Sequence, residues 1–434
     1  MSYLIINGGK KFQGNIQNQS AKNSAVAILC ACAMIKGKTI LTDVPDIEEV
    51  KRIIELLNSI GIKIRYLSQG KIEVDASGDL KMDKIDRLSA EKTRSSIFLW
   101  GALATRVKSY KIPKSGGCHL GERTVRPHWY ALEKFGVNVE SSDCYYFVTN
   151  SPLKGAKIVM YESGDTTTEN AIMAAVLAKG KSTIKMASAN YMVQDLCYFL
   201  IKAGAKIKGA GTTTLEIEGV NELKSVKDYP IMPDPIVAMT FISIAITTKS
   251  SLTIKNCPLE FLELELTKLE VMGQKYKIKN ERKSKNGKFV VVDIEIIPSE
   301  LKALADKIYG RPFPGLNIDN LPLFIPILTQ AKGRTLVHDW AYENRAVLAL
   351  ELQKLGAQIT SLDAHRLWVE GPTTFRANEV TCPSALRPAV NVLICMLAAP
   401  GRSILHNNYM IDRGYENLYA ILNSVGADIQ IVQE

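Results

Sequence analysis

The chain has 434 residues, of which 46% are hydrophobic, and its formal net charge is +10. This length suits two domains that each bury a core, and no apolar run approaches the roughly 18 residues of a membrane span. The positive charge favours an anionic partner. Because the sequence lacks zinc-finger, RNA-binding and basic–aromatic patterns, a small substrate with phosphates or carboxylates fits better than nucleic acid or a membrane.

The first residues and the cysteines favour a cytoplasmic protein. Residues 1–8 read as a strand, since they lack the basic segment and apolar core of a signal peptide. Several cysteines, such as Cys30, Cys32 and Cys395, lie within apolar helical runs, where a cysteine is usually a small buried hydrophobe. We therefore expect a reducing compartment and no disulfide framework.

Six helical runs along the chain end in the pattern Leu-x-x-hydrophobic-Gly, and a short apolar strand follows each. The closing glycines lie about 70 residues apart and are Gly61, Gly136, Gly204, Gly273, Gly356 and Gly426. A glycine directly after a helix commonly adopts the left-handed conformation. The period exceeds that of common solenoid repeats, so it predicts one supersecondary unit used six times in a globular body.

Each unit has an upstream half, in which an apolar helical run leads through a turn into a strand. The predicted pairs are 25–35 with 39–41, 96–104 with 109–112, 170–178 with 182–184, 236–246 with 251–254, 321–328 with 335–337, and 390–399 with 403–405. Few charges in these helices predict burial, whereas the later helix over 48–60 is amphipathic. The unit therefore reads helix, strand, helix, strand.

A glycine-rich segment over residues 114–123, Lys-Ser-Gly-Gly-Cys-His-Leu-Gly-Glu-Arg, is the best single chemical feature. Its glycines predict a surface loop. Lys114, His119 and Arg123 surround Cys118 with positive charge, which favours a reactive thiolate. The alternative is an ordinary exposed cysteine on a turn, and the local sequence leaves both open. The segment lacks the spacing of a phosphate-binding P-loop.

Five segments carry a resemblance to the enolpyruvyl transferase family, and with the repeats they cover essentially the whole chain. They are Ser-Ala-Lys-Asn-Ser-Ala at 20–25, Gly-Gly-Cys-His-Leu-Gly at 116–121, Pro-Gly-Leu-Asn-Ile-Asp at 314–319, Tyr-Glu-Asn-Arg at 342–345 and Ile-Asp-Arg-Gly-Tyr-Glu at 411–416. The resemblance implies an α/β fold, a two-domain inside-out barrel of six βαβαβ-type units, three per domain, with pseudo-threefold symmetry. One domain would span 22–229 and carry the cysteine loop. The second would hold 1–21 and 230–434.

The resemblance also implies an activity, which is transfer of enolpyruvate from phosphoenolpyruvate to the 3-hydroxyl of UDP-N-acetylglucosamine with release of phosphate. In the family's UDP-sugar branch this addition–elimination is the first committed step of peptidoglycan synthesis, on which cell wall biogenesis, cell shape and cell division depend. The two substrates are then the small-molecule partners. No metal or organic cofactor is implied, and the sequence shows no clustered His/Cys ligand spacing.

Residue roles follow from the resemblance. Cys118 matches the acid that protonates C3 of phosphoenolpyruvate and that fosfomycin alkylates. Lys22 matches the lysine on the phosphate, with Asn23 beside it, and Asp319 matches a base near the sugar hydroxyl. Arginine forks suit planar anions, and the arginines that match phosphate- or carboxylate-binding positions are Arg94, Arg123, Arg387 and Arg413. Arg345 and Ala341 complete the substrate-binding set. The expected catalytic residues are Cys118, Asp319, Lys22 and Arg413.

Plainer structural roles stay open for three of these residues. Asp319 could cap a helix over 320–329. Arg413 could be a charge at a helix start, although the helix dipole disfavours a cation there. Asn23 could cap a helix or simply pack.

The sequence departs from the family pattern at four places on the acceptor side. Ala385 replaces an aspartate, and the others are Thr124-Val125-Arg126-Pro127, the segment Gly164–Thr168, and Pro235 after Asp234. Phosphoenolpyruvate chemistry is therefore better supported than the acceptor. Two alternatives follow, namely an enolpyruvyl transferase for another nucleotide or nucleotide sugar, and an inactive paralogue that binds a UDP-sugar.

Overall fold

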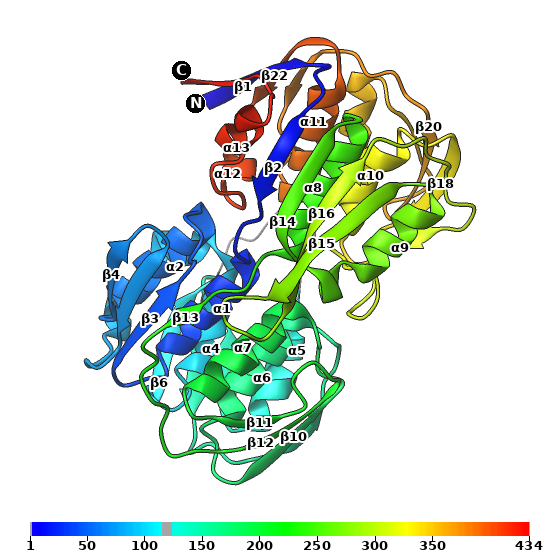
Figure 1. Cartoon of the computed structure of the whole chain (residues 1–434). Helices are drawn as coiled ribbons and strands as arrows, with labels where there is room; N and C mark the ends of the chain where they lie inside the picture. The colour runs from blue at the N-terminus through cyan, green and yellow to red at the C-terminus, as the bar shows by residue number, and fades with distance from the viewer. Residues whose placement is uncertain (1, 115–123, 434) are drawn as a thin grey trace. The chain divides into compact units, whose positions relative to one another are not determined.

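The computed structural model describes residues 2–114 and 124–433, which form two compact units (Figure 1). One unit contains the described residues of 20–117 and 124–232. The other contains 2–19 and 233–433. The ranges implied by the resemblance, 22–229 and 1–21 with 230–434, stay a prediction of where independently folding domains begin and end.

Three sheets belong to the 20–232 unit. The first has the order β13 (Tyr229–Pro230), β3 (Lys38–Thr42), β5 (Lys71–Asp75), β4 (Lys63–Ser68). The second has the order β9 (Lys157–Val159), β10 (Lys181–Lys185), β12 (Thr214–Glu218), β11 (Lys206–Lys208). The third, of three strands, has the order β6 (Ser109–Pro113), β8 (Tyr145–Asn150), β7 (Val137–Ser141).

Three further sheets belong to the other unit. The first has the order β2 (Gln13–Gln17), β14 (Ser251–Pro258), β16 (Val290–Ile297), β15 (Lys275–Lys283). The second has the order β17 (Ile308–Tyr309), β18 (Gly333–His338), β20 (Arg366–Gly371), β19 (Gln358–Ser361). The third has the order β21 (Glu379–Thr381), β22 (Gly401–His406), β1 (Ser2–Gly8), β23 (Ile429–Gln433). The five four-stranded sheets of the molecule share one pattern, a parallel pair followed by two antiparallel pairings. This confirms that one βαβαβ-type unit, closed by a hairpin, is used repeatedly.

Apolar helices fill the inside of each unit. In the 20–232 unit these are α1 (Lys22–Cys32), α4 (Leu99–Ala102) and α6 (Asp165–Ala175), and in the other unit α8 (Pro235–Thr247), α10 (Phe324–Leu328) and α11 (Leu386–Ala398). Every residue of α8 is buried, as its lack of charged residues predicts. With helices inside and sheets outside, each unit is an inside-out α/β barrel.

A second set of helices follows the first strand of each repeat. They are α2 (Glu48–Ser59), α5 (Arg126–Glu133), α7 (Tyr191–Lys202), α9 (Glu263–Val271), the 3-10 helix η5 (Val347–Leu355) and α13 (Leu418–Ser424). All six glycines that close them have positive φ, between 93° and 108°. The left-handed conformation predicted at these positions is therefore confirmed.

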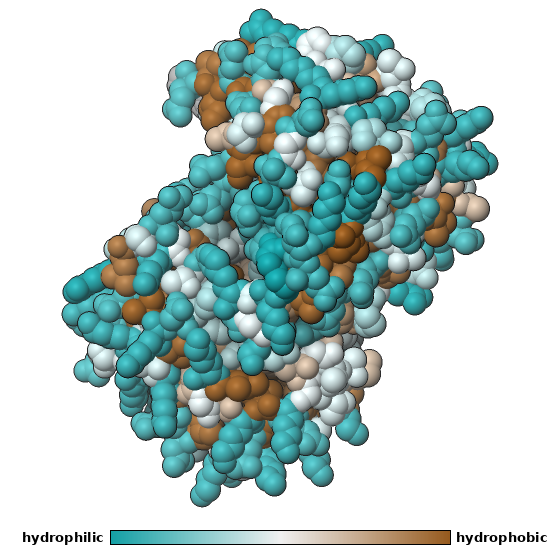
Figure 2. All heavy atoms as spheres, in the orientation of Figure 1, coloured by the Kyte–Doolittle hydropathy of each residue, from teal (hydrophilic) through white to brown (hydrophobic). Residues whose placement is uncertain are grey.

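The surface shows how an exposed sheet edge is kept from pairing. Strand β15 is an edge strand, and it carries Lys275, Lys277, Lys279 and Lys283 in a largely exposed stretch. Charged lysines on an edge oppose pairing with another chain. Hydrophilic residues also predominate on the face seen in Figure 2, with the hydrophobic ones scattered among them.

Candidate active site

The residues assigned from the resemblance divide between the two units. Lys22, Asn23 and Arg94 belong to the 20–232 unit, and a second group belongs to the other unit, namely Asp319, Ala341, Arg345, Arg387 and Arg413. Cys118 and Arg123 lie outside the described residues.

Lys22 and Asn23 open helix α1. The helix begins after Ala21, has no side-chain cap and carries no acidic residue in its first turn. The amide of Asn23 donates to the hydroxyl of Tyr191 (3.1 Å), so a capping role for Asn23 is wrong. A lysine over a helix N-terminus with no acidic residue nearby in the sequence gives a positive site that suits an anion.

Arg94 begins the short 3-10 helix η2 (Arg94–Phe98). Its Nη2 donates to the carbonyl of Thr124 (3.1 Å), the first described residue after the cysteine-bearing segment. The cap of η2 is Thr93, whose hydroxyl accepts from the N–H of Ser95 (3.1 Å). The cap fixes the start of η2, and the contact to Thr124 gives the guanidinium one partner at the edge of the cysteine-bearing segment.

Two of the segments that depart from the family pattern lie together in this unit. His128, in α5, is buried, and its Nε2 lies 3.4 Å from the hydroxyl of Thr166 at the start of α6. Its Nδ1 lies 3.1 Å from the side-chain amide of Asn170, so Nδ1 is the acceptor and Nε2 carries the proton. Burial, assisted by the charge of Arg94, lowers the pKa of His128 to about 3 and keeps the ring neutral.

Asp165, a residue of the departing segment 164–168, is held at the start of α6. Its carboxylate accepts from the hydroxyl of Ser188 (2.5 Å) and from the amide of Asn190 (3.2 Å). The helix dipole favours an acidic residue in the first turn, and its negative charge opposes a second anion at the same helix end. The departure therefore changes the chemistry of this helix terminus.

In the other unit, Arg345 is the centre of a buried cluster. Its guanidinium makes a two-point pair with Asp339, Nε to Oδ2 at 2.5 Å and Nη2 to Oδ1 at 2.9 Å. Nη2 also donates to the carbonyl of Ile318 (2.7 Å), and Nη1 lies 3.2 Å from Oδ1 of Asp319. The ring of Tyr342 lies 4.2 Å from the guanidinium carbon. This pairing with carboxylates raises the pKa of Arg345 although burial opposes it, so the side chain is a fixed cation.

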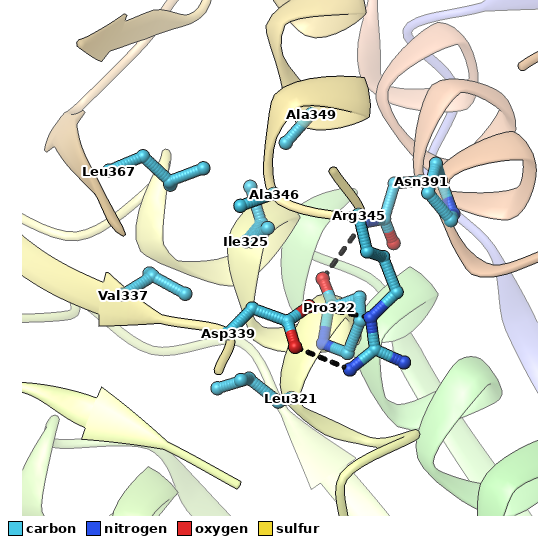
Figure 3. Close-up of a pocket in the computed structure, with 11 residues that line it drawn as sticks. Leu321, Pro322, Ile325, Val337, Asp339, Arg345, Ala346, Ala349, Leu367 and Asn391 are labelled. Carbon is cyan, nitrogen blue, oxygen red and sulfur yellow. Dashed lines mark hydrogen bonds and ion pairs between the residues drawn. The ribbon is translucent and has the colours of Figure 1, made fainter. Parts of the chain in front are cut away.

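A small cavity of about 10 Å³ lies behind this cluster (Figure 3). Asp339, Arg345, Asn391 and Pro388 are among its lining residues. A space of this size is at the lower limit for one water molecule. The Asp339–Arg345 pair is therefore nearly dry.

Arg387 is the second buried arginine of the unit. Its Nη1 donates to the hydroxyl of Tyr415 (2.8 Å), which lies 2.8 Å from the hydroxyl of Thr240 on α8. Its Nη2 lies 4.0 Å from Oδ2 of Asp319. The carboxylate of Asp319, whose side chain is 30% exposed, thus lies between two buried guanidinium groups.

The structure corrects two of the plainer alternatives. Asp319 does not cap a helix, because η4 (Leu321–Leu323) follows Asn320, has no side-chain cap, and the Asp319 carboxylate faces Arg345. Arg413 is not at a helix start but is the C-cap of α12 (Tyr409–Asp412), where a cation suits the dipole. The helix-dipole argument for a functional Arg413 is therefore lost.

Each of the two arginines has an alanine shortly before it in the sequence, Ala385 before Arg387 and Ala341 before Arg345. Ala385 is the N-cap of α11, has extended backbone angles and is 1% exposed. It gives α11 no side-chain cap, which the aspartate of the family pattern could provide. Ala341 is half-buried, four residues before Arg345.

Sequence reasoning missed Asp339 and the roles of Tyr415 and Thr240. Tyr415 lies within a motif segment, but nothing local shows that its hydroxyl meets Arg387. Asp339 directly follows strand β18, and a polar residue at the end of an apolar strand was its only signal. Within residues 2–114 and 124–433 no group of three His, Cys, Asp or Glu side chains has metal-site geometry. Nor does any helix there have both the length and the apolar character needed to cross a membrane.

Comparisons with known proteins agree on one family. The model described as EPSP synthase (3-phosphoshikimate 1-carboxyvinyltransferase) matches residues 6–422. The chain is 33% identical to UDP-N-acetylglucosamine 1-carboxyvinyltransferase of Bacteroides fragilis over 99% of both chains. It is 35% identical to UDP-N-acetylglucosamine 1-carboxyvinyltransferase 2 of Caldanaerobacter subterraneus, again over 99% of both.

Two solved structures match the fold over the full chain. The enolpyruvyl transferase NikO from Streptomyces tendae has a TM-score of 0.87 at 23% identity, covering 100% of this chain and 99% of that one. EPSP synthase from Acinetobacter baumannii has a TM-score of 0.78 at 19% identity, covering 100% of both. The predicted two-domain inside-out α/β barrel is confirmed.

Proposed function

The chain belongs to the EPSP synthase family of enolpyruvyl transferases, and from this membership we propose that it transfers enolpyruvate from phosphoenolpyruvate to the 3-hydroxyl of UDP-N-acetylglucosamine. Full-length relatives at 33% and 35% identity carry the name of that activity, which supports this acceptor. The reaction would be the first committed step of peptidoglycan synthesis, in the cytoplasm.

The proposed chemistry has two stages. The sugar oxygen attacks C2 of phosphoenolpyruvate and loses its proton to a base, while an acid protonates C3, giving a tetrahedral phosphate ketal. A C3 proton then leaves as the C2–O bond to phosphate breaks, which restores the double bond and releases inorganic phosphate. Both stages need a placed acid, a placed base and fixed cations.

The side chains divide these tasks. Cys118 is the acid at C3, and Asp319 is the base at the sugar hydroxyl. Lys22 binds the phosphate at the start of α1, and Asn23 lies beside it. The arginines that bind phosphate and carboxylate groups are Arg94, Arg123, Arg387 and Arg413, and Arg345 and Ala341 complete the substrate-binding set.

One observation carries the proposal furthest: Asp319 is a partly exposed carboxylate between two buried arginines that other groups hold in place. A general base must be ionised before it accepts a proton, and fixed cations favour the ionised form of a carboxylate, although they also weaken it as a base.

A second acceptor, another nucleotide or nucleotide sugar, is favoured by a separate observation. The departing segments around Pro127 and Thr166 meet at His128, and Asp165 places an anion at the start of α6. A changed anion environment there suits a changed phosphate or nucleoside contact. The chemistry at phosphoenolpyruvate would be the same.

Phosphate release tests both possibilities. The protein is mixed with phosphoenolpyruvate and UDP-N-acetylglucosamine, and inorganic phosphate is measured, with UDP and UMP offered as competitors and as acceptors. We expect release only with the nucleotide sugar. Phosphate release with UMP instead would establish the second acceptor. No phosphate release with either compound would reject the proposed transferase activity.

Variants at Cys118 test the acid. Cys118→Ser should lose at least about 99% of turnover and resist fosfomycin, because general acid catalysis contributes roughly a hundredfold or more. Cys118→Asp should retain activity, because a carboxylic acid can still donate a proton. Loss of activity through labelling of a different cysteine would defeat this assignment.

A further inference from the structure

We propose that Asp339 is a positioning residue that holds Arg345 and thereby sets how much of the guanidinium charge reaches Asp319. The inference rests on the proposed function, in which Asp319 is the base. It adds a residue that neither the sequence motifs nor the family resemblance marked.

The contact between Asp339 and Arg345 is the stronger of the two that Arg345 makes with carboxylates. It joins two nitrogens to two oxygens, at 2.5 and 2.9 Å, whereas a single pair of atoms at 3.2 Å joins Arg345 to Asp319. The side chains of Arg345 and Asp339 are 2% and 5% exposed. Two-point pairs shielded from water fix orientation as well as charge.

Two contacts with His365 hold the main chain of Asp339 in place. The N–H of Asp339 donates to the carbonyl of His365 (2.8 Å), and the carbonyl of Asp339 lies 3.0 Å from Nδ1 of His365. These contacts continue the β18–β20 ladder, which ends with His338 opposite Arg366. Because the neighbouring cavity is only about 10 Å³, it has room for at most about one water molecule, so water screens the pair little.

Charge balance gives the functional consequence. Asp339 and Asp319 compete for one guanidinium, and Arg387 at 4.0 Å is the second cation beside Asp319. If the Asp339 charge is removed, Asp319 becomes the main carboxylate partner of Arg345. A carboxylate with a stronger cationic partner has a lower pKa and is a weaker base.

The test compares Asp339→Asn with a matched control. Asp293→Asn also removes a buried aspartate, 7% exposed, from an arginine 3.0 Å away (Arg282), but in the β14–β16 sheet. For each protein, the titration of the Asp319 carboxyl is followed by NMR of carboxyl-labelled aspartate, assigned with Asp319→Asn. The pH profile of kcat is measured in parallel.

In Asp339→Asn, we expect the Asp319 titration and the acidic limb of kcat to move about one unit to lower pH. We expect the plateau of kcat to fall about three- to tenfold, because the base is weaker. Asp293→Asn should change neither, even where the two variants lose similar thermal stability. An unmoved Asp319 titration in Asp339→Asn overturns the proposal.

A second comparison covers the case in which Asp339→Asn does not fold. Arg345→Gln and the double variant Asp339→Asn/Arg345→Gln both lack the cation, and the double variant leaves no unpaired buried charge. If Asp339 acts through Arg345, the Asp319 titration is the same in both, and a difference overturns the inference. Wild-type protein without phosphate release would reject the proposed function instead, and the titrations would still report on Asp339.

Discussion

Ala385 is the residue at which the departure from the family pattern has its clearest physical meaning. It stands at the N-cap of α11, two residues before Arg387, and offers no side-chain oxygen to the helix. The first turn of α11 contains Pro388, which has no N–H, so the N–H of Arg387 is the donor that a capping side chain would meet. A substitution at this position would therefore change both the stability of α11 and the charge beside Arg387, which we propose binds substrate.

We predict that Ala385→Asp and Ala385→Asn both raise the free energy of unfolding by about 0.5–2 kcal/mol, because each supplies the missing cap. Only Ala385→Asp should raise the KM for phosphoenolpyruvate, by about three- to tenfold, since its charge competes with the substrate for Arg387. Thermal unfolding and KM at fixed UDP-N-acetylglucosamine measure the two effects. Tighter phosphoenolpyruvate binding with higher turnover in Ala385→Asp would show that the alanine is a lesion.

At the scale of elements, the closing glycines permit a clean measurement of backbone strain. Gly204 ends the helix–strand joint after α7 with φ of +100°, and a Cβ added there would meet nothing within 4 Å. Gly204→Ala should therefore cost about 1–2 kcal/mol of stability from conformation alone. Gly78→Ala is the control, because its surroundings are equally open and its φ lies outside the left-handed region. Equal stability of the two variants in denaturant unfolding would contradict the left-handed cap.

Helix α6 carries a carboxyl group, that of Glu169, whose burial on folding costs free energy when the group is ionised. Glu169 is 1% exposed, its Oε1 has no hydrogen-bond partner among the described residues, and burial, with Asp165 and Asp195 nearby, raises its pKa well above the usual value. In the unfolded chain the carboxyl ionises near its ordinary pKa. Its contribution to stability is therefore fully present below that pKa and is lost as the pH rises.

We predict that Glu169→Gln stabilises the protein at pH 7–8 and has little effect near pH 4. Each unit of raised pKa corresponds to about 1.4 kcal/mol at a pH above it. Melting temperatures of wild type and variant across this range measure the effect. A pH-independent difference, or a variant less stable at pH 8 than wild type, would show that Glu169 is ionised in the fold.

The elements also show what local sequence could and could not predict. The glycines, the amphipathic helix after Glu48 and the apolar helix over 236–246 were predicted because each depends on a period or a cap within one segment. The run over 96–104 became η2 followed by the short α4, since burial around Trp100 and Asn170 dictates its course. Local sequence allowed Asp319 to be interpreted as a helix cap, because the residue that orients its carboxylate, Arg345, lies 26 residues away.

At the scale of the whole molecule, the two units have closely spaced ends. In the 20–232 unit the N–H of Ala21 donates to the carbonyl of Met232 (2.8 Å), and in the other unit the N–H of Asp234 donates to the carbonyl of Gln19 (2.8 Å). Strand β2, which precedes the inserted segment in the sequence, pairs with β14, which follows it. Strand β13, near the end of the inserted segment, pairs with β3 near its start. Each unit keeps a closed set of sheets.

We expect residues 20–232, expressed alone, to fold cooperatively, because entry and exit lie side by side and no sheet loses a strand. Circular dichroism and denaturant unfolding check this. A fragment of 22–220, which lacks β13, is the control and should be less stable. An unfolded 20–232 fragment would contradict the predicted domain boundaries.

This nesting gives the pairing of β2 with β14 an entropic dependence on the inserted segment. With the insertion unfolded, the pairing closes a loop of about 230 residues, and with it folded, one of about 20, a difference of about 2 kcal/mol. During synthesis, β2 can pair with β14 only after more than half of the chain has been made. A substitution that unfolds part of the inserted segment would therefore also destabilise the surrounding unit, because the β2–β14 pairing would close a longer loop.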